Sequence, residues 1–164
     1  MTDRSSLEEL FVRIIELVLT EFSDIVADAQ LRFTSSGAVE RLRIFLKDES
    51  FVDVWLSESG KYSFHWEHRH VRGFIHRHDN APHSKWRKIK TFPKHFHDGG
   101  EDNVTESNIP DDPVSATNYF LIFVRGFLQK KGKEKRKAVL HKTFGVDRER
   151  IKPFSDKDRG EDRD

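Results

Sequence analysis

Two hydrophobic periodicities divide the first half of the chain. Between residues 5 and 22, apolar side chains recur every three or four positions, at Leu7, Leu10, Phe11, Ile14, Leu17 and Val18. This spacing places them on one side of an α-helix, because the α-helical period is 3.6 residues. The pattern therefore predicts an amphipathic helix at the N-terminal end.

From about residue 24 to residue 79 the hydrophobic period changes to two. Apolar residues alternate with polar ones around Leu42, Ile44 and Leu46, and short polar or glycine-containing stretches separate the alternating runs. Such alternation is typical of half-buried strands, and tight turns favour an antiparallel meander over crossover connections. The five predicted strands are Ala29–Thr34, Val39–Leu46, Phe51–Ser57, Lys61–His68 and Val71–His78.

The pattern is lost between Asp79 and about Asp112. Prolines at 82, 93 and 110 and a glycine pair at 99 and 100 predict a long irregular stretch here. After it, Asp112 and Pro113 fit an N-cap and a first helical position. The residues from Tyr119 to Leu128 are mostly apolar, so we expect a second long helix packed against the sheet.

Together these elements predict an α+β fold, in which N-terminal and C-terminal helices pack on an antiparallel sheet of about five strands. We expect a single domain over residues 1–130. Residues 131–164 are first basic and then of mixed charge, with too little apolar surface to offset the entropy of ordering them. This segment is expected to be a flexible tail.

Composition excludes several kinds of site. The chain has no cysteine, which excludes disulfides, thiolate zinc sites and a cysteine nucleophile. Charged residues interrupt every apolar run, as Arg13 and Glu16 do in the N-terminal helix, so we expect neither a membrane span nor a signal-peptide core. The sequence therefore predicts a soluble, cytoplasmic protein.

A net charge of only +1 conceals a strong local asymmetry. Eight of the nine histidines lie between positions 65 and 97, and eight Lys and Arg residues accompany a single acid, Asp79, between 68 and 97. Residues 98–112 then carry six acids and no Lys or Arg. Aromatic residues, among them Trp66, Trp86 and Phe96, are interleaved with the basic ones. The chain thus combines a basic, imidazole-rich segment with an acidic one.

Three interpretations of the histidine-rich segment compete. The His-x-His pairs at 68/70, 76/78 and 95/97 suggest metal binding, because alternate residues of a strand point to the same face. The histidines also fit the ordinary polar face of a sheet. Finally, cations that neutralise phosphates, aromatic rings that stack on bases and imidazoles that move protons together fit a site for a phosphodiester.

Two strings give the segment a specific resemblance. Arg77-His78-Asp79-Asn80-Ala81-Pro82-His83 and Thr91-Phe92-Pro93-Lys94-His95-Phe96-His97 resemble the motifs of TumE-type toxins of toxin–antitoxin systems, and the resemblance extends over about residues 29–127. The chain departs from that pattern at His76 and His78, where the family has aromatic residues, at Lys94, where it has histidine, and in the longer insert Ser84–Lys90.

The resemblance implies a growth-inhibiting toxin that acts on RNA and is encoded beside a helix-turn-helix antitoxin. Transferred by position, its functional residues are Arg77, Asp79, Asn80, His83, His95 and His97. The same residues suit RNA cleavage without a metal or other cofactor: Arg77 would bind the phosphate, two of the histidines at 83, 95 and 97 would be base and acid, and Asp79 would orient one of them. The expected RNA-binding residues are Asn80, Lys85, Arg87, Lys88, Lys90 and Lys94.

Other interpretations of these motifs remain open. Asp79-Asn80-Ala81-Pro82 also fits a simple turn, because Asp and Asn hydrogen-bond to the nearby backbone. The basic segment is equally compatible with a non-catalytic module that binds RNA or the ribosome. A metal-dependent hydrolase is the third class.

Overall fold

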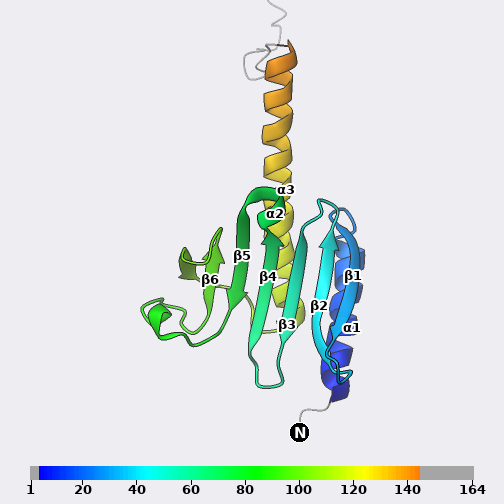
Figure 1. The fold of residues 1–164 in the computed structure, drawn as a ribbon, viewed down its shortest axis with the longest axis vertical. Coiled ribbons are helices and arrows are strands. Elements are labelled where there is room, and N and C mark those ends of the chain that lie inside the picture. The colour runs from blue at the N-terminus through cyan, green and yellow to red at the C-terminus, as the bar shows by residue number, and fades with distance from the viewer. Residues whose placement is uncertain (1–3, 145–164) are drawn as a thin grey trace, which may run out of the picture. The chain divides into compact units, whose positions relative to one another are not determined.

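Every strand of the fold pairs with the next strand along the chain. The computed structural model describes residues 4–144 and contains a seven-stranded antiparallel sheet in the order β1-β2-β3-β4-β5-β6-β7 (Figure 1). The strands are β1 (Val26–Phe33), β2 (Val39–Leu46), β3 (Phe51–Leu56), β4 (Tyr62–His68), β5 (Phe74–Asp79), β6 (His95–Asp98) and β7 (Val104–Glu106). The helices are α1 (Arg4–Glu21), α2 (Arg69–Arg72), the 3₁₀ helix η1 (Ser84–Trp86) and α3 (Pro113–Phe144).

This architecture confirms the predicted α+β class. An antiparallel meander is preceded by one long helix and followed by another along the sequence. Tight turns link the first four strands, and Gly37 and Gly60 adopt positive φ angles of 80° and 82° in two of them. The α3 helix begins as the sequence predicts, because the Asp112 carboxylate accepts hydrogen bonds from the backbone N–H (2.9 Å) and the hydroxyl (2.8 Å) of Ser115. Asp112 is therefore the N-cap.

The strand prediction was wrong in two places. The stretch from Asp79 to Asp112 is not irregular throughout but contains η1, β6 and β7. These strands have four and three residues, which is too short for alternation to be visible in the sequence. In addition, the fifth strand begins at Phe74 rather than Val71, because residues 69–72 form a helical turn that ends at Gly73 in the left-handed conformation (φ 79°).

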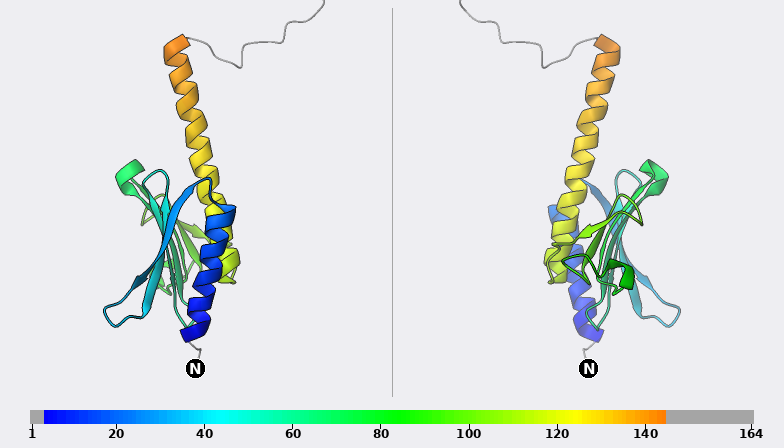
Figure 2. Two further views of the ribbon diagram at one scale, coloured as in Figure 1. Left: turned by 90° about the vertical axis from the view of Figure 1, so that its right-hand side faces the viewer. Right: turned by 90° about the vertical axis from the view of Figure 1, so that its left-hand side faces the viewer.

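The helix α1 and the first part of α3, up to Arg125, cover the same face of the sheet. Figure 2 shows α1 and the first part of α3 side by side on one face of the sheet, and neither of them on the opposite face. The side chains of Phe11, Ile14 and Val18 from α1 are buried, as are Phe120 and Val124 from α3. From here on we call the opposite side of the sheet the uncovered face.

An arginine connects the end of the first part of α3 to the turn after α1. The Arg125 guanidinium donates to Asp24 Oδ1 at 2.7 Å and to the carbonyl of Glu21. The chain divides into two compact units between Arg125 and Gly126. In the second unit, α3 continues to Phe144, so the described part of the basic segment after residue 130 is helical. The mixed-charge stretch after 144, expected to be a flexible tail, lies outside the described residues. Within residues 4–144, the helices are all too short or too polar to cross a bilayer.

Three histidines belong to the core between the sheet and α3. His68 is fully buried, lies parallel to Trp66 with ring centroids 3.8 Å apart, and is 2.9 Å from His76 (Nε2 to Nδ1). His78 stacks on Phe96 at 4.2 Å and hydrogen-bonds to the Ser107 hydroxyl at 2.7 Å. For His68, His76 and His78, the interpretation as ordinary sheet residues therefore fits better than a role in chemistry.

Burial of these rings makes the stability of the fold depend on pH. Burial lowers the pKa of His68 to about 4 and that of His78 to about 3, with further lowering by nearby positive charge. Because the unfolded chain binds these protons below about pH 6.5 whereas the folded chain does not, the free energy of unfolding falls as the pH drops from 6.5 toward 4.

We expect a loss on the order of 2 kcal/mol between pH 6.5 and 5, measured by urea unfolding. The variant His78→Asn lacks one titrating ring, so it should be less stable at pH 7 but lose less stability over this range. The variant His83→Asn, at an exposed position, should keep the full pH dependence. Equal pH dependence in His78→Asn and the wild type would contradict the assignment.

Candidate functional site

Four side chains of the predicted site form a two-by-two arrangement on the uncovered face. On β5, Arg77 and Asp79 are two residues apart and therefore share a face, whereas His76 and His78 point toward α3. In the pairing of β5 with β6, Arg77 lies opposite His97 and Asp79 lies opposite His95. The predicted site residues Arg77 and Asp79 therefore lie on the same face of β5, which extends one residue beyond the predicted end at His78. The prediction that His95 and His97 belong to a loop was wrong, since both are on β6.

Asp79 is the centre of this group. Its Oδ2 atom accepts a hydrogen bond from Arg77 Nε at 3.0 Å and lies 3.6 Å from His97 Nε2, and its Oδ1 atom lies 3.1 Å from His95 Nε2. Oδ1 also accepts a hydrogen bond from the backbone N–H of Ala81 at 3.0 Å. Burial by itself would raise the pKa of Asp79, but the hydrogen bonds and the nearby positive charge outweigh it and lower the pKa to about 2.

The backbone fixes the orientation of both histidines. His95 Nδ1 is 2.8 Å from the carbonyl of Pro93, and His97 Nδ1 is 2.8 Å from the carbonyl of Glu101. A carbonyl only accepts hydrogen bonds, so each Nδ1 carries a proton and each Nε2 is left with a lone pair in the neutral ring. Both Nε2 atoms face the Arg77–Asp79 pair. His95 is completely buried, and His97 exposes 5% of its side chain.

Arg77 links the buried group to the surface. Its Nη2 atom lies 3.1 Å from His97 Nε2 and donates to Glu101 Oε2 at 2.8 Å. Its side chain is 23% exposed, whereas that of Glu101 is 51% exposed. Burial tends to lower the pKa of Arg77, but Glu101 and Asp79 more than compensate and raise it, so the guanidinium stays charged. Glu101 was not among the predicted site residues, although it is an acid four residues after His97 in the acidic segment.

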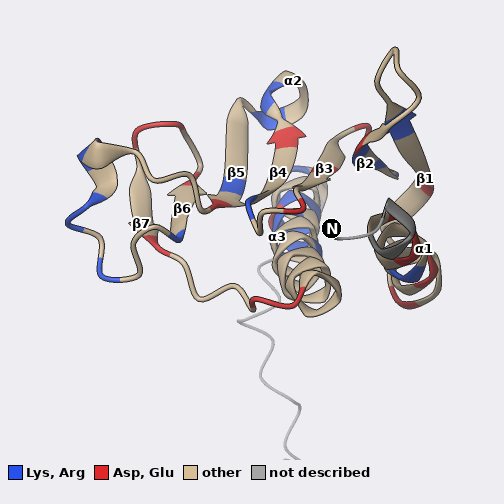
Figure 3. Ribbon diagram, turned by 90° about the horizontal axis from the view of Figure 1, so that it is seen from below, with Lys and Arg blue, Asp and Glu red and all other residues tan. Residues whose placement is uncertain are grey.

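Trp86 is a second residue of the site that was not among the predicted residues. Its ring lies 6.1 Å from that of His95 and, edge to face, 6.0 Å from that of His97. It belongs to η1, in the same loop as the exposed basic residues Lys85, Arg87, Lys88 and Lys90. Lys85 Nζ is 4.4 Å from the centre of the Trp86 ring. In Figure 3 this loop lies beside β6 and β7 at one side of the sheet, with its basic positions in blue.

We call Arg77, Asp79, His95 and His97 the central group. The other predicted residues are not part of it. His83 is exposed in the loop after β5. The Asn80 side chain connects two hairpins, since it donates to the Gly60 carbonyl at 2.9 Å and accepts from the Tyr62 N–H at 3.0 Å. Lys94 donates to the Ile109 carbonyl (2.5 Å) and to Asp111 (3.0 Å). Asn80 and Lys94 therefore have structural partners of their own.

Asp79, His95 and His97 also form a set of three groups that is compatible with a metal ion. One donor atom from each lies within 4.8 Å of the others. The buried His95 Nε2 has no hydrogen-bond partner in the described part of the chain, since its contact with Asp79 lacks hydrogen-bonding geometry. Imidazole and carboxylate ligands suit zinc, iron and other transition metals. The Arg77 cation, however, already contacts both Asp79 and His97, which disfavours a second cation there.

We expect Asp79→Asn to lower the free energy of unfolding at pH 7 by about 2 kcal/mol, because Arg77 would lose a mostly buried anionic partner. The figure is below that for a fully buried pair because Arg77 is partly exposed. A matched control is Glu40→Gln, which removes a surface pair with Arg41 in which Glu40 is 43% exposed. This change should cost less than about 0.5 kcal/mol. Urea unfolding of both variants measures the difference, and equal losses would contradict a central role for Asp79.

Comparison with known proteins agrees with the motifs. Residues 14–128, more than half of the chain, match the sequence model of the family described as Toxin TumE. The matched region includes the complete sheet and all four residues of the central group. The chain matches no curated protein and no solved structure. The chain belongs to the TumE toxin family.

Proposed function

We propose that this toxin cleaves RNA without a metal ion, at the group formed by Arg77, Asp79 and His97. The observation that carries the proposal is the position of Arg77, which contacts both the Asp79 carboxylate and Nε2 of His97. A fixed cation and a fixed proton acceptor at one point are what cleavage of a phosphodiester by its own 2′-hydroxyl requires.

Arg77 is suited to bind the phosphate because part of its guanidinium is exposed. Glu101 occupies that exposed part, with distances of 3.3 Å and 2.8 Å from its carboxylate oxygens to Arg77. A phosphate presents similar oxygens to the guanidinium fork, so an incoming phosphate would compete with Glu101. Asp79 would keep Arg77 in place during this exchange, since it holds Nε on the buried side.

His97 is the better candidate for the base and His83 for the acid. In the reaction, His97 Nε2 takes the proton of the 2′-hydroxyl, the 2′-oxygen attacks phosphorus, and the bond to the 5′-oxygen breaks. That oxygen receives a proton from the acid, so the products are a 2′,3′-cyclic phosphate and a 5′-hydroxyl. His95 is fully buried and cannot touch RNA in this conformation, so we assign it a positioning role toward Asp79.

The loop after β5 would contribute phosphate contacts outside the reacting centre. Lys85, Arg87, Lys88 and Lys90 are exposed there. Because Trp86 lies over His95 and His97, binding of RNA by this loop would also affect access to His97. We further propose that the antitoxin is a helix-turn-helix protein that covers this basic loop with acidic groups, since charge complementarity speeds association.

The catalytic assignment is tested with three alanine variants. Arg77→Ala, His83→Ala and His97→Ala should each abolish growth inhibition and slow cleavage of purified RNA by about 10²–10⁴-fold, the usual contribution of an acid–base group. Activity of the wild type should require the 2′-hydroxyl and leave a cyclic phosphate or its hydrolysis product.

The matched control is His70→Ala, which changes an exposed histidine that hydrogen-bonds to the carbonyl of Glu49 and lies outside the site. It should retain activity. Folded variants at 77, 83 and 97 that still inhibit growth would overturn the assignment. Wild-type protein that binds RNA without cutting it would instead favour a non-catalytic RNA- or ribosome-binding module.

A metal-dependent hydrolase is the second candidate, favoured by the unpartnered Nε2 of His95 beside Asp79 and His97. Hydrogen bonds from the Nδ1 atoms to backbone carbonyls are also typical of metal-binding histidines. Elemental analysis of untagged protein distinguishes the two candidates. We expect less than one equivalent of zinc, iron, nickel or manganese per chain, and cleavage that persists in EDTA. A stoichiometric metal that is lost in the double variant His95→Ala/His97→Ala would favour the hydrolase.

A further inference from the structure

The uncovered face of the sheet holds a cavity directly beside Arg77. Its volume is about 360 Å³. It is lined by six residues from four adjacent strands, namely Arg41, Asp53, Trp55, Ser63, His65 and Arg77. The lining includes one large aromatic ring, two guanidinium groups and small polar groups. The cavity is therefore open to a ligand that combines a flat ring with negative charge.

The pairing register explains why these residues meet. Arg43, Asp53, His65, Arg77 and His97 are successive cross-strand partners from β2 to β6 and form one row across the uncovered face. In the neighbouring row, Trp55 pairs with Ser63, Ser63 with Asp79, and Asp79 with His95. The cavity and the central group are thus parts of one continuous polar surface.

Trp55 is exposed although it is one of the largest side chains on the sheet. It is 38% exposed, whereas Trp66 on the opposite face is completely buried. An exposed tryptophan on a flat sheet provides a platform on which an unpaired base can stack.

The charges around Trp55 leave one arginine available. Arg43 holds Asp53 with two hydrogen bonds of 2.8 Å, which neutralises the only acid in the lining. Arg41 is less tightly bound, with an ion pair of 3.4 Å to Asp53 and one of 3.0 Å to the exposed Glu40. Its buried Nε donates to no acceptor in the described part of the chain. Because its side chain is 36% exposed, Arg41 keeps guanidinium donors for an additional anion.

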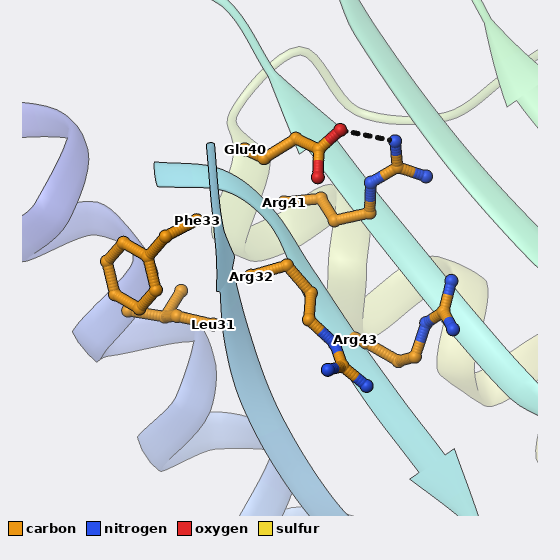
Figure 4. Close-up of a pocket in the computed structure, with 6 residues that line it drawn as sticks. All are labelled: Leu31, Arg32, Phe33, Glu40, Arg41 and Arg43. Carbon is orange, nitrogen blue, oxygen red and sulfur yellow. Dashed lines mark hydrogen bonds and ion pairs between the residues drawn. The ribbon is translucent and has the colours of Figure 1, made fainter. Parts of the chain in front are cut away.

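The basic surface continues to the outer strands. Figure 4 shows Arg32, Arg41 and Arg43 extending on one side of β1 and β2, with Leu31 and Phe33 on the other. Arg32 and Arg41 are cross-strand partners. From β2 to β5, three strand spacings amount to about 14 Å, a distance that a single strand of a few nucleotides spans.

We propose that this cavity binds an unpaired nucleotide of the RNA next to the cleaved bond, with its base on Trp55 and its phosphate at Arg41. The inference rests on the proposed function for the position of the cleaved bond, at Arg77, and defines the substrate as single-stranded RNA that crosses the strands of the sheet. Bases of a duplex are stacked within it and unavailable to Trp55.

Binding can be measured without cleavage. The probe is a short, fluorescein-labelled 2′-O-methyl RNA of mixed sequence, which lacks the attacking hydroxyl, and fluorescence anisotropy gives its Kd. Trp55→Ala should weaken binding about 10-fold, the size expected for one base–aromatic stack, and Trp55→Phe should restore most of it. Arg41→Gln should weaken binding and reduce its salt dependence.

Two matched controls lie away from the uncovered face. Tyr119→Ala removes an aromatic side chain of similar exposure (40%) from α3, and Arg13→Gln removes an exposed charge from α1. Both should bind the probe as the wild type does, and the same probe annealed to its complement should bind more weakly than the single strand.

The outcomes separate this inference from the proposed function. If the wild type does not bind the single-stranded probe, or if folded Trp55→Ala binds it as tightly as the wild type, the inference is overturned even where RNA is cleaved. If binding depends on Trp55 and Arg41 but RNA is never cleaved, the catalytic proposal fails and the binding surface stands.

Discussion

The pairing of β5 with β6 is the constraint on which the rest of the site depends. Its register sets Arg77 opposite His97 and Asp79 opposite His95, and sends the alternate residues His78 and Phe96 into the core under α3. Because side chains alternate along a strand, a slip of one residue would bury Arg77 and Asp79 and expose the aromatic stack. Core packing and site geometry therefore specify the same register.

In the central group, which consists of Arg77, Asp79, His95 and His97, opposite charges stabilise one another. Asp79 is buried and remains ionised because Arg77 and the backbone N–H of Ala81 donate hydrogen bonds to its carboxylate. Arg77 in turn has Glu101 on its exposed side. Removing one member of such a network leaves another charge uncompensated at low dielectric constant. A cluster of polar side chains can therefore be almost completely buried and still bind an anion, because its cation, Arg77, is partly exposed.

Because alternate residues of a strand point to opposite faces of the sheet, the histidines of the strands fall into two classes. His68, His76 and His78 lie on the helix-covered side, where burial lowers their pKa values and keeps them neutral. His95 and His97 lie on the uncovered side, where backbone carbonyls orient them toward a carboxylate and a guanidinium. The uncovered face then continues through His65 to Trp55 and Arg41, which extends the same polar surface over most of the sheet.

The sequence by itself determined the α+β class, most strands of the meander, the cap of α3 at Asp112 and the family, because periodicity, capping and motifs are local properties of the chain. It also identified Arg77, Asp79, His95 and His97 as candidates. Only the tertiary structure decided that β6 joins the sheet, that Glu101 and Trp86 contact these residues, and that Asn80 and Lys94 have partners elsewhere. Those contacts join residues that are far apart in sequence or belong to strands too short to show a period, so they arise from the pairing register and from packing, which no local pattern encodes.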